Sequence, residues 1–170
     1  MKEALLGKTL SELQLIIREL ALPEYTALQI TDWLYVKRAG AFVNMTNLSK
    51  KARALLEEQY ETGVSLPHKL QVSSDGTKKY LFETGQGRFI ETAVIPDKDR
   101  ITVCVSSQAG CKLGCLFCMT GKQGFQGQLT AGQIINQLIS IEEAGKITNI
   151  VYMGMGEPLD NPDEVLKSIQ

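Results

Sequence analysis

The chain has 170 residues, of which 44% are hydrophobic and 22% charged, and its formal net charge is −1. This composition is ordinary for a globular protein, so a sizeable core is expected and disorder is not. The near-zero charge gives no overall electrostatic footprint for nucleic acid. Any RNA contact would therefore need a local basic patch.

No stretch reaches the roughly 18 consecutive apolar residues that a membrane span needs, and the N-terminus lacks the pattern of a signal peptide. We therefore expect a cytoplasmic protein without a membrane partner. All four cysteines fall within fifteen residues, from Cys104 to Cys118. A disulfide scaffold spreads its cysteines to tie distant segments together, so this clustering favours metal binding.

The first part of the chain is expected to form three short helices. Thr9 and Glu12 fit a capping box at the start of the first helix, which Pro23 ends. The second is expected over residues 24–37, and the third begins near Asn47 or Ser49 and stops before Gly63. Apolar residues at helical spacing should face the core, namely Leu10, Leu13, Ile16, Ile17, Leu20, Ala27, Ile30, Leu34, Ala52, Leu55, Leu56 and Tyr60, with Trp33 as a further candidate.

The next segment changes from helical spacing to short apolar runs separated by turns. Two glycine-containing turns divide three such runs, which predicts a short antiparallel meander. A polar break at residues 96–99 follows the last run. The runs cover residues 69–73, 77–83 and 88–95.

The last part of the chain alternates strand and helix. A short strand at residues 101–106 leads into a Gly-rich loop that holds the cysteines, and Thr130 is expected to cap a helix ending at Gly145. A second strand at 148–153 precedes a helix that begins near Asp163. This βαβα order implies parallel strands with a right-handed crossover.

The expected fold class is α+β followed by α/β. Residues 1–66 form a small helical domain, residues 67–98 an antiparallel meander, and residues 99–170 the first βα units of a larger α/β structure. Two parallel strands cannot bury both faces of a sheet, and they leave long unpaired edges. The chain also stops at Gln170 in the opening turns of a helix, so the sequence predicts a truncated protein.

Cys111, Cys115 and Cys118 have the spacing C-x3-C-x2-C. Three thiolates this close can bind three irons of a cubane cluster and leave the fourth iron without a protein ligand. The loop also follows a predicted parallel strand, at the end where α/β enzymes place their chemistry. A zinc site is the alternative, but it would need a fourth ligand. Cys104 lies awkwardly within a strand and His68 is distant in sequence, so the spacing favours a cluster.

Longer blocks of the sequence resemble the radical S-adenosylmethionine (SAM) enzymes. Within these, the chain is most similar to the adenine-C2 RNA methyltransferases, which modify 23S rRNA and, in some members, tRNA. The resemblance extends over nearly the whole chain. It is carried by the blocks Cys104–Cys111, Cys111–Cys118, Gln123–Phe125 and Tyr152–Asn161.

The resemblance implies a [4Fe–4S] cluster on the three loop cysteines and SAM as a cofactor. It also implies an RNA partner, an electron donor such as a flavodoxin, and a monomeric full-length enzyme. The implied fold is a partial (β/α) barrel, of which residues 99–170 would be the truncated start. Residues 1–66 resemble the RNA-binding accessory domain, where phosphate contacts are expected from Lys37, Arg38, Lys50, Lys51 and Arg53.

The resemblance also implies roles for single residues. Gly156 and Glu157 match residues that contact SAM, and Phe117 is expected to cover the cluster or to pack on the adenine of SAM. Glu91 matches an acidic proton acceptor, and Cys104 matches a cysteine that helps to release the product. From the residues alone, structural roles are also open. Gly156 and Glu157 fit a Gly-rich turn, and Phe117 fits ordinary packing within a loop. Glu91 fits the solvated face of a strand, and Cys104 fits a small core residue.

The resemblance implies methylation of C2 of adenine, a carbon that is neither acidic nor a good nucleophile. Ordinary polar methyl transfer to it is unfavourable, so a radical route through the cofactors is implied. One SAM methylates a cysteine near the C-terminus, and a radical derived from a second SAM takes hydrogen from that methyl-cysteine intermediate. No cysteine follows Cys118 in this sequence, so we expect that the chain as it stands cannot complete methylation. The alternatives are methylation at adenine C8 and a zinc-stabilised RNA-binding module without catalysis.

Overall fold

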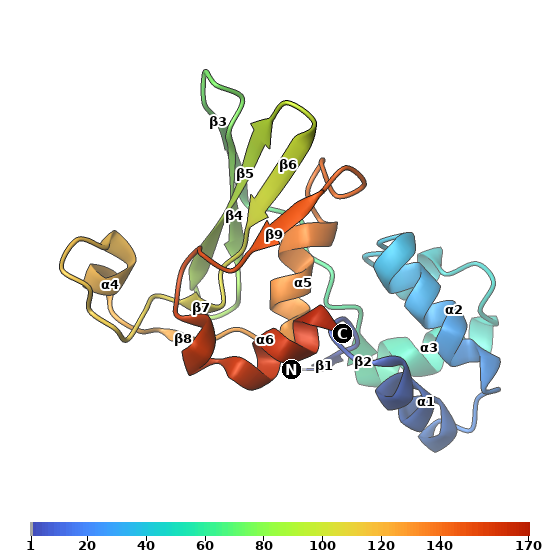
Figure 1. Ribbon diagram of the computed structural model, residues 1–170. Coiled ribbons are helices and arrows are strands. Elements are labelled where there is room, and N and C mark those ends of the chain that lie inside the picture. Colours follow the sequence, from blue (N-terminus) through green and yellow to red (C-terminus); the bar gives the residue numbers. More distant parts are fainter. Residues whose placement is uncertain (1) are drawn as a thin grey trace.

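The computed structural model describes residues 2–170. A helical part lies at one end, a mixed β-sheet with two helices against it lies in the middle, and the cysteine loop projects at the other end (Figure 1). Within residues 2–170, no helix is long and apolar enough to cross a membrane.

The helical part begins as the sequence predicts. Thr9 and Glu12 form the expected capping box: Glu12 N–H donates to Thr9 Oγ1 over 3.3 Å, and Thr9 N–H donates to Glu12 Oε2 over 2.7 Å. Ser49 caps the third helix by accepting from the N–H of Ala52. The elements are α1 (Leu10–Glu19), α2 (Tyr25–Thr31), a π-helical turn (Asp32–Val36), a 3-10 turn (Phe42–Asn44) and α3 (Lys50–Gln59).

Two features of the helical part differ from the expectation. The helix expected over residues 24–37 is α2 followed by a π turn, in which the N–H of Lys37 donates to the carbonyl of Asp32, five residues back. Leu10 is 39% exposed rather than packed inward, because it opens the first turn of α1. The buried members of the predicted core are Leu13, Ile16, Ile17, Ala27, Ile30, Leu34, Ala52 and Leu56.

A short parallel pair that the sequence did not indicate ties the N-terminus to the end of α3. Strand β1 (Glu3–Ala4) pairs with β2 (Tyr60–Glu61). The ladder is extended by the N–H groups of Leu5 and Leu6, which donate to carbonyls of residues 61 and 62. Both leucines are buried in the core of the helical part.

The central sheet has five strands in the order β3-β4-β5-β6-β9. The first four are antiparallel neighbours, and β6 and β9 are parallel, which confirms both the meander and the βαβ crossover. The strands are β3 (Lys69–Val72), β4 (Lys78–Glu83), β5 (Phe89–Asp97), β6 (Arg100–Cys104) and β9 (Asn149–Val151).

The meander and the parallel pair are parts of one sheet, whereas the sequence suggested a parallel pair with unpaired edges. The polar segment at 96–99 is a tight hairpin: Asp97 pairs with Arg100, and Lys98 adopts a positive φ of 52° at the turn. The expected division between residues 98 and 99 therefore falls inside a hairpin. One edge of β6 is covered by β5 and the other by β9.

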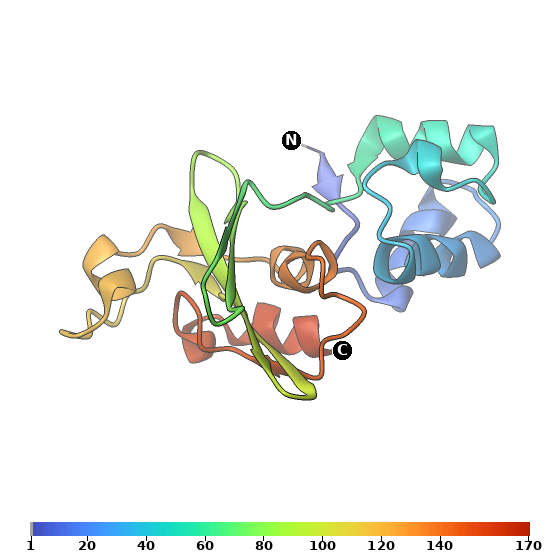
Figure 2. The ribbon, with the colours of Figure 1, turned by 90° about the horizontal axis from the view of Figure 1, so that it is seen from above.

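Helices α5 (Ala131–Ile139) and α6 (Pro162–Ile169) pack with the sheet, and α5 lies between the sheet and the helical part (Figure 2). Thr130 caps α5 in a capping box, as expected, although the helix ends at Ile139 rather than at Gly145. Strand alternation buries one face of the sheet in a core with α5. Its members include Tyr80, Phe82, Ile90, Val94, Val103, Val105 and Ile134.

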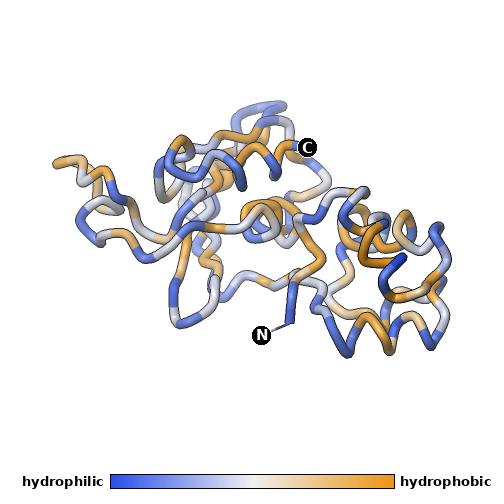
Figure 3. The backbone as a smooth tube through the Cα atoms, turned by 90° about the horizontal axis from the view of Figure 1, so that it is seen from below, coloured by the Kyte–Doolittle hydropathy of each residue, from blue (hydrophilic) through white to orange (hydrophobic). Residues whose placement is uncertain are grey.

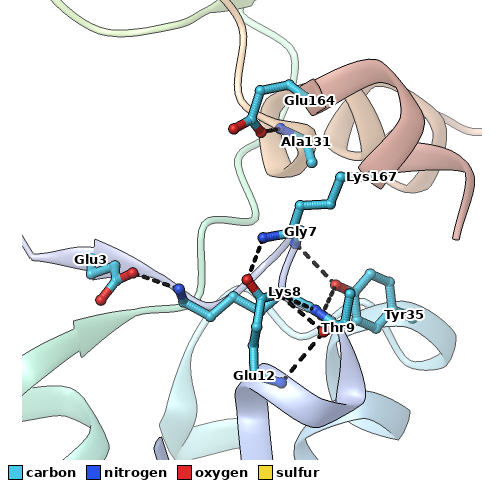
Figure 4. A network of polar contacts seen from close by, with 9 residues as sticks. All are labelled: Glu3, Gly7, Lys8, Thr9, Glu12, Tyr35, Ala131, Glu164 and Lys167. Atoms are coloured by element: carbon cyan, nitrogen blue, oxygen red, sulfur yellow. Dashed lines mark hydrogen bonds and ion pairs between the residues drawn. The ribbon is translucent and has the colours of Figure 1, made fainter. Parts of the chain in front are cut away.

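The helical part is joined to α5 and α6 by polar contacts and a close backbone approach. Lys167 of α6 donates to Glu12 of α1 over 2.5 Å (Figure 4), and a Cβ on Gly7 would lie 2.2 Å from the backbone nitrogen of Gly132 on α5. The carbonyl and the N–H of Ser65 bond the side chain of Asn136 on α5. The two parts therefore contact each other along the first turns of α5 and along α6.

Candidate functional site

The cysteine loop is closed at its base by a two-stranded ladder. Strand β7 (Gln108–Ala109) follows β6 and pairs with β8 (Gly127–Gln128). Between them the loop carries the short helix α4 (Met119–Gln123) and projects from the sheet (Figure 1). Gly110 has a φ of +71°, and a Cβ there would lie 1.8 Å from the carbonyl oxygen of Gly124. The two arms of the loop can cross this closely only because residue 110 is glycine.

The outer end of the loop exposes apolar side chains. Leu116 is 92% exposed and Phe117 is 91% exposed, and Figure 3 shows the hydrophobic stretch at the loop tip, at the left of the view. Cys115 is exposed, and Cys111 and Cys118 are partly exposed. Across residues 2–170, no group of three or more His, Cys, Asp and Glu side chains is gathered to hold a metal ion. The three cysteines share one loop, but their sulfurs do not form a ligand set in this arrangement.

The donor chemistry of the loop nevertheless fits an iron–sulfur cluster. Backbone N–H groups, first that of Gly121 and then that of Thr120, donate to the sulfur of Cys118 and lower its pKa. A lowered pKa favours the thiolate, which is the form that binds iron. The N–H of Cys118 also donates to the carbonyl of Cys115 over 3.0 Å, which fixes the C-x2-C turn. The loop thus supplies three thiols at short spacing, one of them already in a thiolate-favouring setting.

Glu91 and Cys104 lie on the face of the sheet opposite α5. Cys104 of β6 pairs with Ala93 of β5, and Glu91 lies two residues along from Ala93 on the same side of the strand. Burial raises the pKa of the Cys104 thiol, and the N–H of Met153 offsets this only partly. Glu91 is paired with Lys79 of β4 over 3.0 Å, and its side chain is 48% exposed.

A shallow cleft of about 140 Å³ lies on this open face. Glu91 is the one site residue from the sequence analysis that lines it. The lining residues are Lys69, Gln71, Lys79, Leu81 and Glu91.

The turn that follows β9 is packed against the segment that follows β6. Ser106 Oγ donates to the carbonyl of Glu91 over 2.6 Å and accepts from the N–H of Met155 over 2.9 Å. A Cβ on Gly154 would lie 2.7 Å from the carbonyl oxygen of Val105. Gly156 has a φ of +97°, so its backbone conformation also favours glycine. These glycines are required by backbone packing, whether or not a ligand binds them.

Glu157 ends this turn and is only partly buried. Its Oε1 accepts from the N–H of Leu159 over 3.1 Å and so caps the 3-10 turn Pro158–Asp160. The structure therefore brings Gly156 and Glu157 to the base of the cysteine loop. Phe117 lies instead at the exposed tip of that loop.

Comparisons with known proteins match both parts of the chain. Residues 105–169 match the Radical SAM superfamily, and residues 4–62 match the ribosomal RNA large subunit methyltransferase N-terminal domain. A probable dual-specificity RNA methyltransferase RlmN of Phocaeicola vulgatus is 57% identical over 169 residues, which cover 99% of this chain and 48% of that protein. The chain belongs to the family of radical SAM RNA methyltransferases.

Two further relatives have lower sequence identity to this chain. A dual-specificity RNA methyltransferase RlmN of Desulfosudis oleivorans is 48% identical over 149 residues, which cover 85% of this chain and 40% of that protein. The crystal structure of a radical SAM methyltransferase from Sphaerobacter thermophilus superposes with a TM-score of 0.91 at 40% identity, covering 98% of this chain and 51% of that one. The chain spans about half the length of the curated relatives it matches.

The radical SAM match contains both loops of the site, but sequence reasoning missed the polar residues that join them. Asn161 is buried and donates from Nδ2 to the carbonyls of Ser107 and Leu129. Gln108 is buried between the cysteine loop and the turn after β9. The signal was the polar run 106–108 directly after an apolar strand, since buried polar side chains need specific partners.

Proposed function

We propose that this chain provides the cluster-binding and SAM-binding part of an enzyme that methylates C2 of an adenine in 23S rRNA, and in tRNA, through a methyl-cysteine intermediate. One observation carries the proposal. The cysteine loop and the Gly154–Glu157 turn follow two adjacent parallel strands, β6 and β9, and pack together at their carboxyl ends. This is where α/β enzymes place their chemistry. The dual-specificity names of the relatives support both RNA substrates.

In this proposal Cys111, Cys115 and Cys118 hold a [4Fe–4S] cluster, and Gly156 and Glu157 bind SAM. Glycines let a ligand approach the backbone, and a carboxylate can accept hydrogen bonds from an ammonium group. When bound, the cluster supplies an electron, received from a donor such as a flavodoxin, to cleave SAM reductively. Sheet and helices would be the start of a partial (β/α) barrel.

Glu91, Cys104 and Phe117 have roles that depend on the open face and the loop. Glu91 accepts a proton from the substrate. Glu91 and Cys104 lie on the same open face of the sheet, which supports action of both residues on one substrate. Cys104 assists product release, and burial raises the pKa of its thiol, which favours the protonated form. Phe117 covers the cluster or stacks on the adenine of SAM, which would remove an exposed aromatic side chain from water.

The helical part, residues 1–66, is proposed to contact RNA, with residues 67–98 as the meander and 99–170 as the catalytic part. Lys50 and Lys51 are exposed at the start of α3, which suits phosphate contacts. Lys37 is less free, because it pairs with Asp32 over 2.5 Å and lies over the ring of Trp33.

The experiment that tests the proposal is anaerobic reconstitution with iron and sulfide, followed by metal analysis and SAM binding. A brown protein with about four irons per chain that binds SAM is expected. A Cys115→Ser variant, which removes one ligand, should lose most of the iron. A colourless protein that carries zinc would support the binding-module alternative instead.

The position of methylation is tested separately, by mass spectrometry of nucleosides from RNA treated with the whole enzyme of which, in this proposal, the chain is one part. The expected product is 2-methyladenosine, and 8-methyladenosine would contradict the C2 assignment. We expect the 170-residue chain alone to give no methylated RNA, because no cysteine after Cys118 is present to carry the methyl group. Turnover by this chain alone would contradict the methyl-cysteine route.

A further inference from the structure

Gln108 is fully buried, and its side-chain amide joins the two loops of the site. Its exposed fraction is 0%. Oε1 accepts from the backbone N–H of Glu157 over 3.0 Å, and Nε2 donates to Asp160 Oδ2 over 2.7 Å and to Gln128 Oε1 over 2.8 Å. The acceptor and both donor hydrogens of the amide are therefore used. Glu157 and Asp160 belong to the turn after β9, whereas Gln108 begins the cysteine loop.

Asp160 extends this connection to the cysteine side of the loop. Its Oδ2 also accepts from Lys112 Nζ over 2.8 Å, and Lys112 directly follows Cys111. The same ammonium lies 4.5 Å from the ring centroid of Phe125, on the opposite arm of the loop. The Lys112 side chain is 49% exposed, so this ion pair alone contributes little. The buried amide of Gln108 is the stronger element of the chain of contacts.

The turn is shaped around Gln108. A Cβ on Gly156 would lie 2.5 Å from the Cβ of Gln108 and 2.8 Å from its backbone nitrogen. Any shift of the turn along the loop would separate the Glu157 N–H from Oε1 and leave a desolvated donor and acceptor without partners. Such groups are costly to leave unpaired, so the amide selects one register of the two loops.

We propose that Gln108 is a positioning residue that sets the Gly154–Glu157 turn against the cysteine loop, and so fixes where SAM lies relative to the cluster. This inference rests on the proposed function, because it takes the two loops to hold the cluster and SAM. Gln108 itself touches neither reacting group. It acts through the backbone of Glu157 and through Asp160.

The test compares Gln108→Ala with Asn136→Ala, a control that truncates another buried amide. Asn136 bonds Ser65 at the far side of α5, and its loss should destabilise the protein without moving the turn. Two quantities are measured: hydrogen exchange of the peptide spanning residues 152–160 in the metal-free protein, and the SAM dissociation constant of the reconstituted protein. Iron content is recorded for both variants.

Gln108→Ala is expected to keep its iron, to exchange the protected amides of this peptide about tenfold faster and to bind SAM about tenfold more weakly. Loss of one buried set of hydrogen bonds implies changes of this size. Asn136→Ala is expected to exchange this peptide and to bind SAM as the unaltered protein does. Equal exchange and equal SAM affinity in the two variants would overturn the inference. An unaltered protein that takes up iron but no SAM would contradict the proposed function itself, which is a different failure.

A second pair of variants covers the case in which Gln108→Ala fails to fold. Asp160→Asn keeps an acceptor for the Gln108 amide, whereas Asp160→Ala removes it. SAM affinity should fall in Asp160→Ala and be restored in Asp160→Asn. Equal losses in the two Asp160 variants would show that the hydrogen bond to Gln108 does not position the turn.

Discussion

Gly132 lies where the helical part meets the rest of the protein, and replacing it with alanine tests that contact. A Cβ on Gly132 would lie 2.3 Å from the carbonyl oxygen of Leu6 and 3.0 Å from its carbon. Gly7 faces it from the other side, with a φ of +89° and a Cβ position 2.2 Å from the Gly132 nitrogen. All of these atoms belong to backbone, so no side-chain rotation can relieve the overlap.

Two effects of Gly132→Ala oppose each other. Alanine in place of glycine favours a helix by about 1 kcal/mol, and somewhat less in the first turn, where Gly132 lies. Overpacking a tight contact costs about 1–3 kcal/mol, and backbone atoms place this contact at the upper end. The net loss in free energy of unfolding is therefore about 1–2 kcal/mol, which corresponds to a Tm lowered by about 2–8 °C for a chain of this size.

The assay is thermal unfolding followed by circular dichroism, with Gly145→Ala as the matched control. The nearest atom to a Cβ on Gly145 is Arg38 Nη2 at 3.7 Å, an ordinary contact distance. We expect the Tm of Gly145→Ala to stay close to that of the unaltered protein. A Gly132→Ala protein with an unchanged or higher Tm would show that the approach of Gly7 to Gly132 is not required, and that the helical part docks differently.

Three further changes have expected outcomes. Thr130→Ala removes the side chain that caps α5 and should lower the free energy of unfolding by about 1 kcal/mol, measured by denaturant unfolding against Thr130→Ser. Burial alone would raise the pKa of Glu143. Hydrogen bonds donated by Lys78 and by the hydroxyl of Tyr80 outweigh the effect of burial and lower this pKa. The ionised Glu143 therefore stabilises the folded protein above the ordinary glutamate pKa of about 4.3, and this stabilisation is lost as pH falls through the lowered pKa. The Glu143→Gln protein should be less stable at neutral pH, and its stability should change less between neutral and acidic pH. In the metal-free protein, mass spectrometry should find Cys118 alkylated faster than Cys104, because backbone N–H groups lower the pKa of the first thiol and burial raises that of the second; equal rates would contradict this.

Elements with local signals could be predicted from the sequence. The capping boxes at Thr9 and Thr130 involve residues three positions apart, so the sequence contains the whole interaction. The meander likewise depends on turns between neighbouring strands. By contrast, β1 and β2 have two residues each and join segments 57 positions apart. A strand of two residues has no alternation to detect, so only the folded chain reveals the pair.

The site shows the same division between local and distant information. Cysteine spacing predicted a cluster-binding loop, because the three proposed ligands lie close together in sequence. The connection from Gln108 to Glu157 and Asp160 joins residues about fifty positions apart, so the polar run 106–108 could indicate a buried polar side chain but not its partners. The sequence also could not show that Glu91 pairs with Lys79, since this depends on the register of β4 and β5.

Helix α5 relates the helical part to the proposed catalytic loops. Ile134 packs into the sheet core, whereas Ile135 and Ile139 pack against the core of the helical part. The same helix follows β8, which closes the cysteine loop. One rigid element thus contacts both cores and adjoins the base of the loop. In the proposed function, RNA held by the helical part would meet the cluster at a distance that α5 fixes, so loosening the Gly7–Gly132 contact should weaken RNA placement without removing iron.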